Sequence, residues 1–140
     1  MSETVSVTGT PQITLETGTT DAVVNYSSGS GSAVLIFTYT VAAGDTNSDL
    51  GYTSSSSLAF NSGTIRDLSG TAAVLTLPTP GQTNSLKANK AIVIDGVVPQ
   101  VPTGIVADDG NTNVTLTWTA NTDGDIASYR VYGDTSASPV

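Results

Sequence analysis

Apolar and polar residues alternate with a period of two along most of the chain. The longest such run is "AVLIFTYTVAA" at residues 33–43. One face of this run carries Leu35, Phe37, Tyr39 and Val41, and the other carries Val34, Ile36, Thr38 and Thr40. A period of two is typical of a half-buried strand, and no segment shows the helical period. We therefore predict that residues 33–43 form the central strand of a β-sheet.

Shorter alternating segments recur on both sides of this run, at residues 5–7, 13–15, 22–26, 52–60, 63–67, 73–77 and 90–95. Turn-forming stretches such as "GTTD", "SSGSGS", "NSG" and "PTPGQTN" separate them. Short strands and turns at this spacing favour an all-β fold, an antiparallel Ig-like β-sandwich over residues 1–96. The serine run at residues 54–57 could be a flexible linker, but its flanks Tyr52, Leu58 and Phe60 favour an exposed edge strand.

The pattern changes at "DGVVPQVPTG", where two prolines forbid a central strand and stiffen the chain. We place a linker at residues 97–101 and a second domain at residues 102–140. Alternation restarts there in three predicted strands, around Ile105, Leu116 and Tyr129.

Composition narrows the function classes. Twelve carboxylates face four basic side chains, for a net charge of −8. Nucleic acid is excluded as a partner because phosphate contacts need clustered Lys and Arg, whereas an acidic surface attracts cations. No run approaches the length of a membrane span, so we expect no membrane insertion. No signal peptide is visible at the start, and we expect the targeting signal of an extracellular protein to lie outside this sequence.

The second domain reads "PTGIVADDGNTNVTLTWTANTDGDIASYRVYGDTSASP", with a proline at its start, Trp118 on the second predicted strand and Tyr129 on the third. This stretch resembles the first three strands of a fibronectin type III domain. The resemblance implies an incomplete fibronectin III-like set of strands. Three explanations stay open: a truncated domain, completion by another chain, or packing of these strands against the first domain.

The first domain contains "FTYTVAAGDTNSDLGYTSSSSLAFNSGTIRDLSGTAAVLTLPTPG" followed by "NKAIVIDG". With these stretches it resembles Ig-like repeats that occur in tandem in very large bacterial surface and secreted proteins. The resemblance implies an extracellular or cell-surface location and a role as a stalk or spacer unit of an adhesin-like protein. It also implies neighbouring domains of the same polypeptide as partners, and junctions stiffened by calcium.

Catalysis finds no support in the residue types. Without His or Cys, neither a Ser-His-Asp nor a Cys-His site can be assembled. Asp108 and Asp109 are a pair of carboxylates, but neighbours on an extended segment point to opposite faces. The stretch "ADDGNTN" is also typical of a turn. We expect no enzyme.

Calcium is the expected cation, since it takes six to eight oxygen ligands and needs neither His nor Cys. The turn "NTDGDIA" offers Asn121, Asp123 and Asp125 at alternating positions, without the later Glu of an EF-hand. Ig-like connectivity would bring loops of the first domain to the pole nearest this turn. The predicted metal ligands are therefore Asn121, Asp123 and Asp125 with Asp95, Asp45, Asp49 and Asp67. The alternative is a set of solvated acidic loops that keep the module soluble.

These observations favour a non-catalytic structural or spacer module. Two other classes stay open. One is an accessory carbohydrate-associated module of a secreted polysaccharide-degrading enzyme, which a row of coplanar exposed aromatics would support. The other is a virion or filament subunit that assembles by strand complementation.

Overall fold

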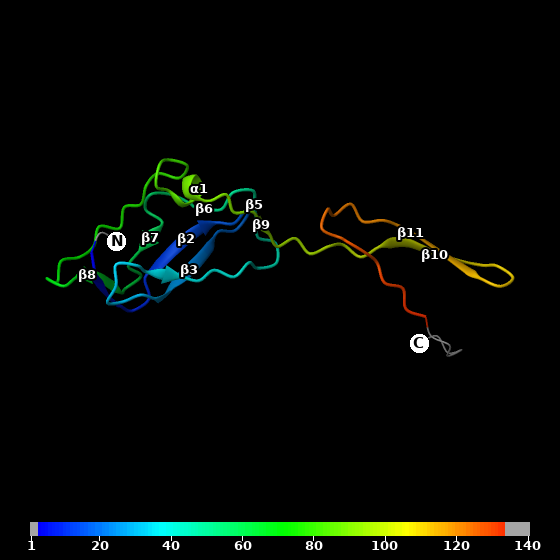
Figure 1. The fold of residues 1–140 in the computed structure, drawn as a ribbon, viewed down its shortest axis with the longest axis horizontal. Coiled ribbons are helices and arrows are strands. Elements are labelled where there is room, and N and C mark those ends of the chain that lie inside the picture. The colour runs from blue at the N-terminus through cyan, green and yellow to red at the C-terminus, as the bar shows by residue number, and fades with distance from the viewer. Residues whose placement is uncertain (1–2, 134–140) are drawn as a thin grey trace. The chain divides into compact units, whose positions relative to one another are not determined.

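The computed structural model describes residues 3–133 and is all-β, with antiparallel sheets throughout. The chain divides into two compact units, Met1–Val97 and Val98–Val140, called unit 1 and unit 2 below. The alternating pattern thus predicts the fold class correctly. Figure 1 shows the elements of each unit.

The main sheet of unit 1 is built on two long strands, β2 (Gln12–Glu16) and β3 (Ala22–Ser28), paired from Gln12 opposite Asn25 to Leu15 opposite Ala22. Its strand order is β4-β3-β2-β6, and a further strand also pairs with β2. The remaining members are short: β4 (Ile36–Phe37), β6 (Gly51–Tyr52) and β7 (Leu58–Ala59).

The run at residues 33–43 is not the central strand that its pattern predicts. Only Ile36–Phe37 pairs, at the edge of the sheet, and the ladder is irregular between Tyr26 and Ser28. Beyond Phe37 the Ser27 hydroxyl accepts the Thr38 backbone N–H, so a side chain replaces the backbone partner. Leu35, Phe37 and Tyr39 still alternate inward, whereas Val41 is exposed.

The serine run is neither a linker nor a strand. β6 and β7 both pair with β2, where Leu15 lies opposite Tyr52 and Ile13 opposite Leu58. Most of the residues between Tyr52 and Leu58 therefore have no position opposite them on β2 and loop out of the sheet. Ser57 is buried in this loop and caps it, because its hydroxyl accepts the Ser54 N–H at 2.8 Å and shares a 2.7 Å hydrogen bond with Thr53.

Two smaller ladders complete unit 1. β1 (Val5–Thr8) pairs with β8 (Thr64–Asp67), and β5 (Thr46–Asn47) pairs with β9 (Ile94–Asp95). A single helical turn, α1 (Leu86–Asn89), begins at Ser85, whose hydroxyl accepts the Ala88 N–H. The sequence pattern does not predict it because one turn is too short to show a helical period.

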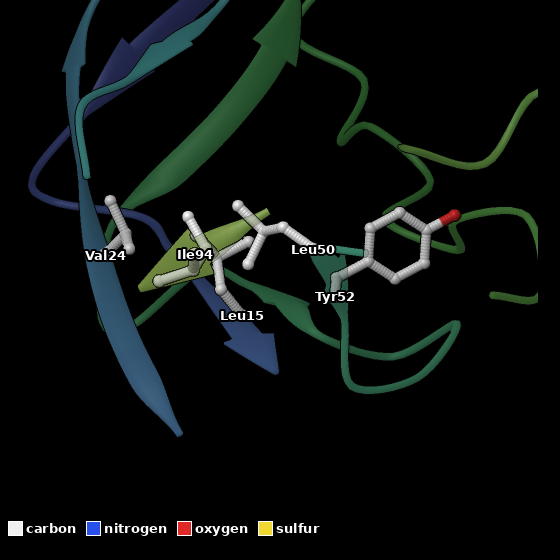
Figure 2. Packing of buried hydrophobic residues seen from close by; sticks show 5 residues of the cluster. All are labelled: Leu15, Val24, Leu50, Tyr52 and Ile94. Carbon is white, nitrogen blue, oxygen red and sulfur yellow. The ribbon is translucent and has the colours of Figure 1, made fainter. Parts of the chain in front are cut away.

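The core of unit 1 lies where the main sheet meets β9. Its buried members come from β2, β3, β6, β9 and the residue before β6: Leu15, Val24, Tyr52, Ile94 and Leu50 (Figure 2). Phe37, Tyr39, Leu77, Leu86 and Ile92 are among the half-buried side chains packed against them. Ile65 on β8 is fully buried. Burial of one such aliphatic side chain stabilises a fold by about 1.5–3 kcal/mol.

Unit 2 contains one hairpin, β10 (Thr103–Asp109) with β11 (Val114–Thr119), closed by a turn in which Gly110 N–H donates to Asn113 O. The third strand predicted around Tyr129 does not form among residues 120–133. A strand needs a neighbouring backbone, and Tyr129 instead makes side-chain contacts. Its hydroxyl donates to Asn121 Oδ1 and its ring meets Trp118 edge-on, with centroids 5.4 Å apart. The last part of the resemblance, residues 134–139, lies outside the described residues.

Candidate functional site

Asp108 and Asp109 are consecutive on β10, opposite Thr115 and Val114. Consecutive residues of a strand point to opposite faces, so the two carboxylates do not converge on one point. This geometry offers no pair of the kind that cleaves a glycosidic bond, where both carboxylates flank one substrate atom.

Asp45 organises the loop between β4 and β5. Its Oδ2 accepts the Tyr39 hydroxyl at 2.6 Å and the Ala42 N–H at 2.8 Å. These two hydrogen bonds, that of Tyr39 first, lower the pKa of Asp45 below its usual value. Burial first, then the hydrogen bond to Asp45 and the charge of Asp45, together raise the pKa of Tyr39 to about 12. Asp45 therefore stays ionised and Tyr39 stays neutral over the whole physiological range.

Asp95 and Asp45 are neighbours at the β5–β9 ladder, but their carboxylates cap different loops. Asp95 is directly opposite Thr46, the residue after Asp45, and both Asp95 and Thr46 are exposed. The Asp45 carbonyl accepts the Gly96 N–H at 2.7 Å, whereas the Asp45 carboxylate accepts the Tyr39 hydroxyl and the Ala42 N–H. Asp95 Oδ1 accepts the Val97 N–H and so caps the end of β9. Each of these two predicted ligands is thus already engaged with its own loop.

Asp49 follows β5, where its N–H donates to Asn47 Oδ1. Its own Oδ1 is buried and has no hydrogen-bond partner among the residues that the structure describes. Of the four predicted ligands in unit 1, this is the one with a carboxylate oxygen that is both buried and without a hydrogen-bond partner in the described part of the chain.

Asp67 ends β8 and lies opposite Val5 of the N-terminal strand β1. Figure 1 shows β8 at the end of unit 1 away from β5 and β9. The structure thus does not bring Asp67 to Asp45 and Asp95, because the loop after β8 follows the pairing with β1. Its Oδ1 accepts the Ser69 hydroxyl and the Thr71 N–H, and these bonds, that of Ser69 first, lower the pKa of Asp67.

The predicted ligands of unit 2 gather around Gln100. The Gln100 N–H donates to Asp123 Oδ2 at 2.9 Å, and Asn121 Nδ2 donates to the Gln100 carbonyl. Asn121 Oδ1 accepts the Tyr129 hydroxyl at 2.7 Å. Asp125 is exposed beyond them. Two of the three predicted side chains are therefore already hydrogen-bonded to the backbone of Gln100.

Among residues 3–133 no three His, Cys, Asp or Glu side chains form a group able to hold a metal ion. Asp45, Asp67, Asp95 and Asp123 each accept a backbone N–H, so their first role is to cap loops. Within each unit they do not form a ready calcium cage. The predicted shared calcium site stays a prediction.

One feature of unit 1 has no counterpart in the sequence predictions. A hollow of about 490 Å³ lies along β3, lined by residues 20–27 and by residues 38–40, Ala42 and Asp45. The hollow exists because residues 38–42 do not pair with β3. The alternating pattern of these residues predicts a paired strand and so gives no sign of the hollow.

Comparison with protein-family models, curated proteins and solved structures finds no match for this chain. Within the described residues, no helix has the length and apolar character that would let it cross a membrane.

Proposed function

We propose that this chain is a non-catalytic structural module that spaces neighbouring domains within a large extracellular or cell-surface protein. Its resemblance to tandem Ig-like repeats of adhesin-like proteins, followed by a fibronectin III-like segment, is part of this proposal. The role is mechanical: each unit holds its neighbours apart along the polypeptide.

The observation that carries the proposal is how the two ends of unit 1 are tied into it. At the N-terminal end β1 pairs with β8 from Val5 to Thr8, and Val5 also bridges to Ser32. At the other end β9 pairs with β5, Gly96 N–H donates to Asp45 O and Gly44 N–H donates to Gly96 O. β8, the partner of β1, and β9 lie toward opposite ends of the unit (Figure 1). Tension applied through the chain therefore meets an antiparallel ladder at each end, with the core between them.

The use of polar side chains supports the same role. Carboxylates and hydroxyls of unit 1 are engaged with their own backbone at Asp45, Asp67, Ser57 and Ser85. A side chain that caps a loop stabilises the fold and is less free to meet a substrate. Polar side chains that stabilise the fold in this way suit a spacer, because a spacer must remain folded under load.

Calcium binding is part of the proposal as a stiffening device. Asp49, with its unsatisfied oxygen, and Asp95 are the ligands of unit 1 best suited to it, and Asp123 and Asp125 are those of unit 2. Bound calcium would neutralise carboxylates in a chain of net charge −8.

A second candidate function is assembly by strand complementation. Unit 2 exposes Ile105, Leu116 and Val131 along a hollow of about 290 Å³ that Trp118 and Tyr129 also line. A lone two-stranded hairpin is at best marginally stable, so this face favours a further strand from another chain. The assembly state, measured by light scattering across a concentration series, tests it: a monomer at all concentrations would contradict it.

The carbohydrate-associated role receives no comparable support. Trp118 and Tyr129 meet at an interplanar angle of 65°, so they do not form the coplanar platform on which sugars stack.

The spacer proposal is tested by stretching single molecules that are attached at both chain ends. We expect unit 1 to unfold in one cooperative step and to refold on relaxation. The Ile65→Ala variant, which opens a cavity beside the β1–β8 ladder, should lower the unfolding force. Leu68→Ala is the matched control, because Leu68 is 84% exposed.

A further inference from the structure

The hollow along β3 opens between two backbones. On the β3 side its lining includes every residue from Thr20 to Ser27, and on the facing side it includes residues 38–40. Side chains of consecutive strand residues alternate between faces. The hollow is lined by inward-facing and outward-facing residues of both β3 and the segment opposite it. It is therefore a gap between two backbones in the plane of the sheet.

Every second residue of β3 directs its backbone N–H and C=O to β2, and the residues between them direct theirs into this gap. Tyr26 N–H donates to Pro11 O at 2.8 Å, so Tyr26 and, by alternation, Val24 and Ala22 direct their backbone groups to β2. The N–H and C=O of Val23 and Asn25 point the other way. The pairing of β3 with β4 ends at the Tyr26–Phe37 pair. Because Tyr26 directs its backbone groups to β2, the ladder bonds of this pair come from its neighbours, and the open edge consists of the Asn25 N–H and both backbone groups of Val23.

Side-chain hydrogen bonds hold the facing chain away from β3. Near β4 the Ser27 hydroxyl occupies the Thr38 N–H. Farther along, the Asp45 carboxylate occupies the Ala42 N–H and the Tyr39 hydroxyl. The segment at residues 38–42 is thus anchored at two points, and the gap between the anchors remains open.

We propose that this open edge of β3, over Ala22–Asn25, receives an extended segment of another polypeptide as an added strand. An open strand edge is a template for such pairing, in which backbone hydrogen bonds give affinity and alternate side chains give specificity. Four residues of strand span about 13 Å. The site goes beyond the proposed spacer role, because it would let the module capture a partner.

Charge and exposure define the chemistry of the partner. Among the described residues that line the hollow, Asp21 and Asp45 are the charged ones, and both are acidic. Val23, on the outer face of β3, is 57% exposed. The segment that fits is therefore extended and β-branched, with Lys or Arg beside the two carboxylates. The partner is a different protein, since this chain has only four basic residues of its own.

The probe is a fluorescent eight-residue peptide of alternating Val and Thr with two Lys at one end, titrated into the full chain by anisotropy. A peptide with Glu in place of Lys should bind at least several-fold more weakly, as should the Lys peptide methylated at every second backbone nitrogen. Asp21→Asn should weaken binding about 2- to 5-fold at low salt, the range of an exposed ion pair. Asp109→Asn in unit 2 removes the same charge and should leave binding unchanged.

Amide exchange of the free chain locates the edge. The Val23 and Asn25 amides should exchange rapidly without peptide and become protected with it. Protection of both amides in the free chain would show that the edge is already paired and would overturn the proposal. Equal binding of the Lys and methylated peptides, or peptide-dependent protection confined to β10 and β11, would overturn it as well.

Discussion

Ser57→Ala should destabilise unit 1 although serine runs are ordinarily tolerant of substitution. Ser57 is 7% exposed, and its hydroxyl accepts the Ser54 N–H at 2.8 Å and bonds Thr53 Oγ1 at 2.7 Å. Each such bond contributes about 1 kcal/mol net, and a donor left unsatisfied in a part-buried place costs about 1–3 kcal/mol. We expect a loss of about 2 kcal/mol in the free energy of unfolding, or roughly 10 °C in melting temperature for a unit of this size.

The assay is urea unfolding of the full chain followed by the fluorescence of the tyrosines and by circular dichroism. Ser56→Ala is the control, because Ser56 lies in the same run but is exposed. It should change the free energy of unfolding by less than about 0.5 kcal/mol. If both variants unfold like the parent chain, the serine run is not a capped loop and the reasoning from Ser57 fails.

Other predictions concern the core, ionisation and calcium. Ile65→Ala should cost about 2–5 kcal/mol in urea unfolding, because Ile65 is fully buried, and an effect equal to that of Leu68→Ala would contradict it. In an ultraviolet titration Tyr39 should ionise with a pKa of about 12, and Tyr39→Phe should remove that step. Because the folded-state pKa of Tyr39 is raised, its contact with Asp45 stabilises below about pH 10 and is lost as the pH rises through about 12. The pKa of Asp45 is lowered, so its contribution is present above about pH 4 and is lost as the pH falls further, and Asp45→Asn should flatten the acid limb of a melting profile. Calcium should raise the melting temperature and chelator should reverse the rise, whereas no shift at high calcium would refute the ion site.

Local alternation predicts the strand class well and the strand ends poorly. Residues 33–43 alternate as a strand, and Leu35, Phe37 and Tyr39 do turn inward. What stops the strand is the pairing of Ser27 with Thr38 across the sheet, which sequence neighbours do not encode. The serine loop also depends on pairing between distant residues, because the register of β6 and β7 on β2 sets the length of the loop.

For the candidate metal ligands, the sequence gives the residue type but not the hydrogen bonds that each side chain makes in the fold. Asp and Asn in turns are common both as ion ligands and as caps of their own backbone. Asp67 and Asp123 act as caps, and only the fold shows which N–H each one accepts. The separation of Asp67 from Asp95 depends on the pairing of β8 with β1, which an assumed Ig-like order of loops did not anticipate.

The spacer role is tested most directly by the force at which unit 1 unfolds when the chain is stretched from its two ends. We predict a single step that lengthens the chain by roughly 300 Å less the folded span, as expected for about 90 extended residues, and full recovery between cycles. Gradual extension without a step, or a step that Ile65→Ala leaves unchanged in force, would contradict the account.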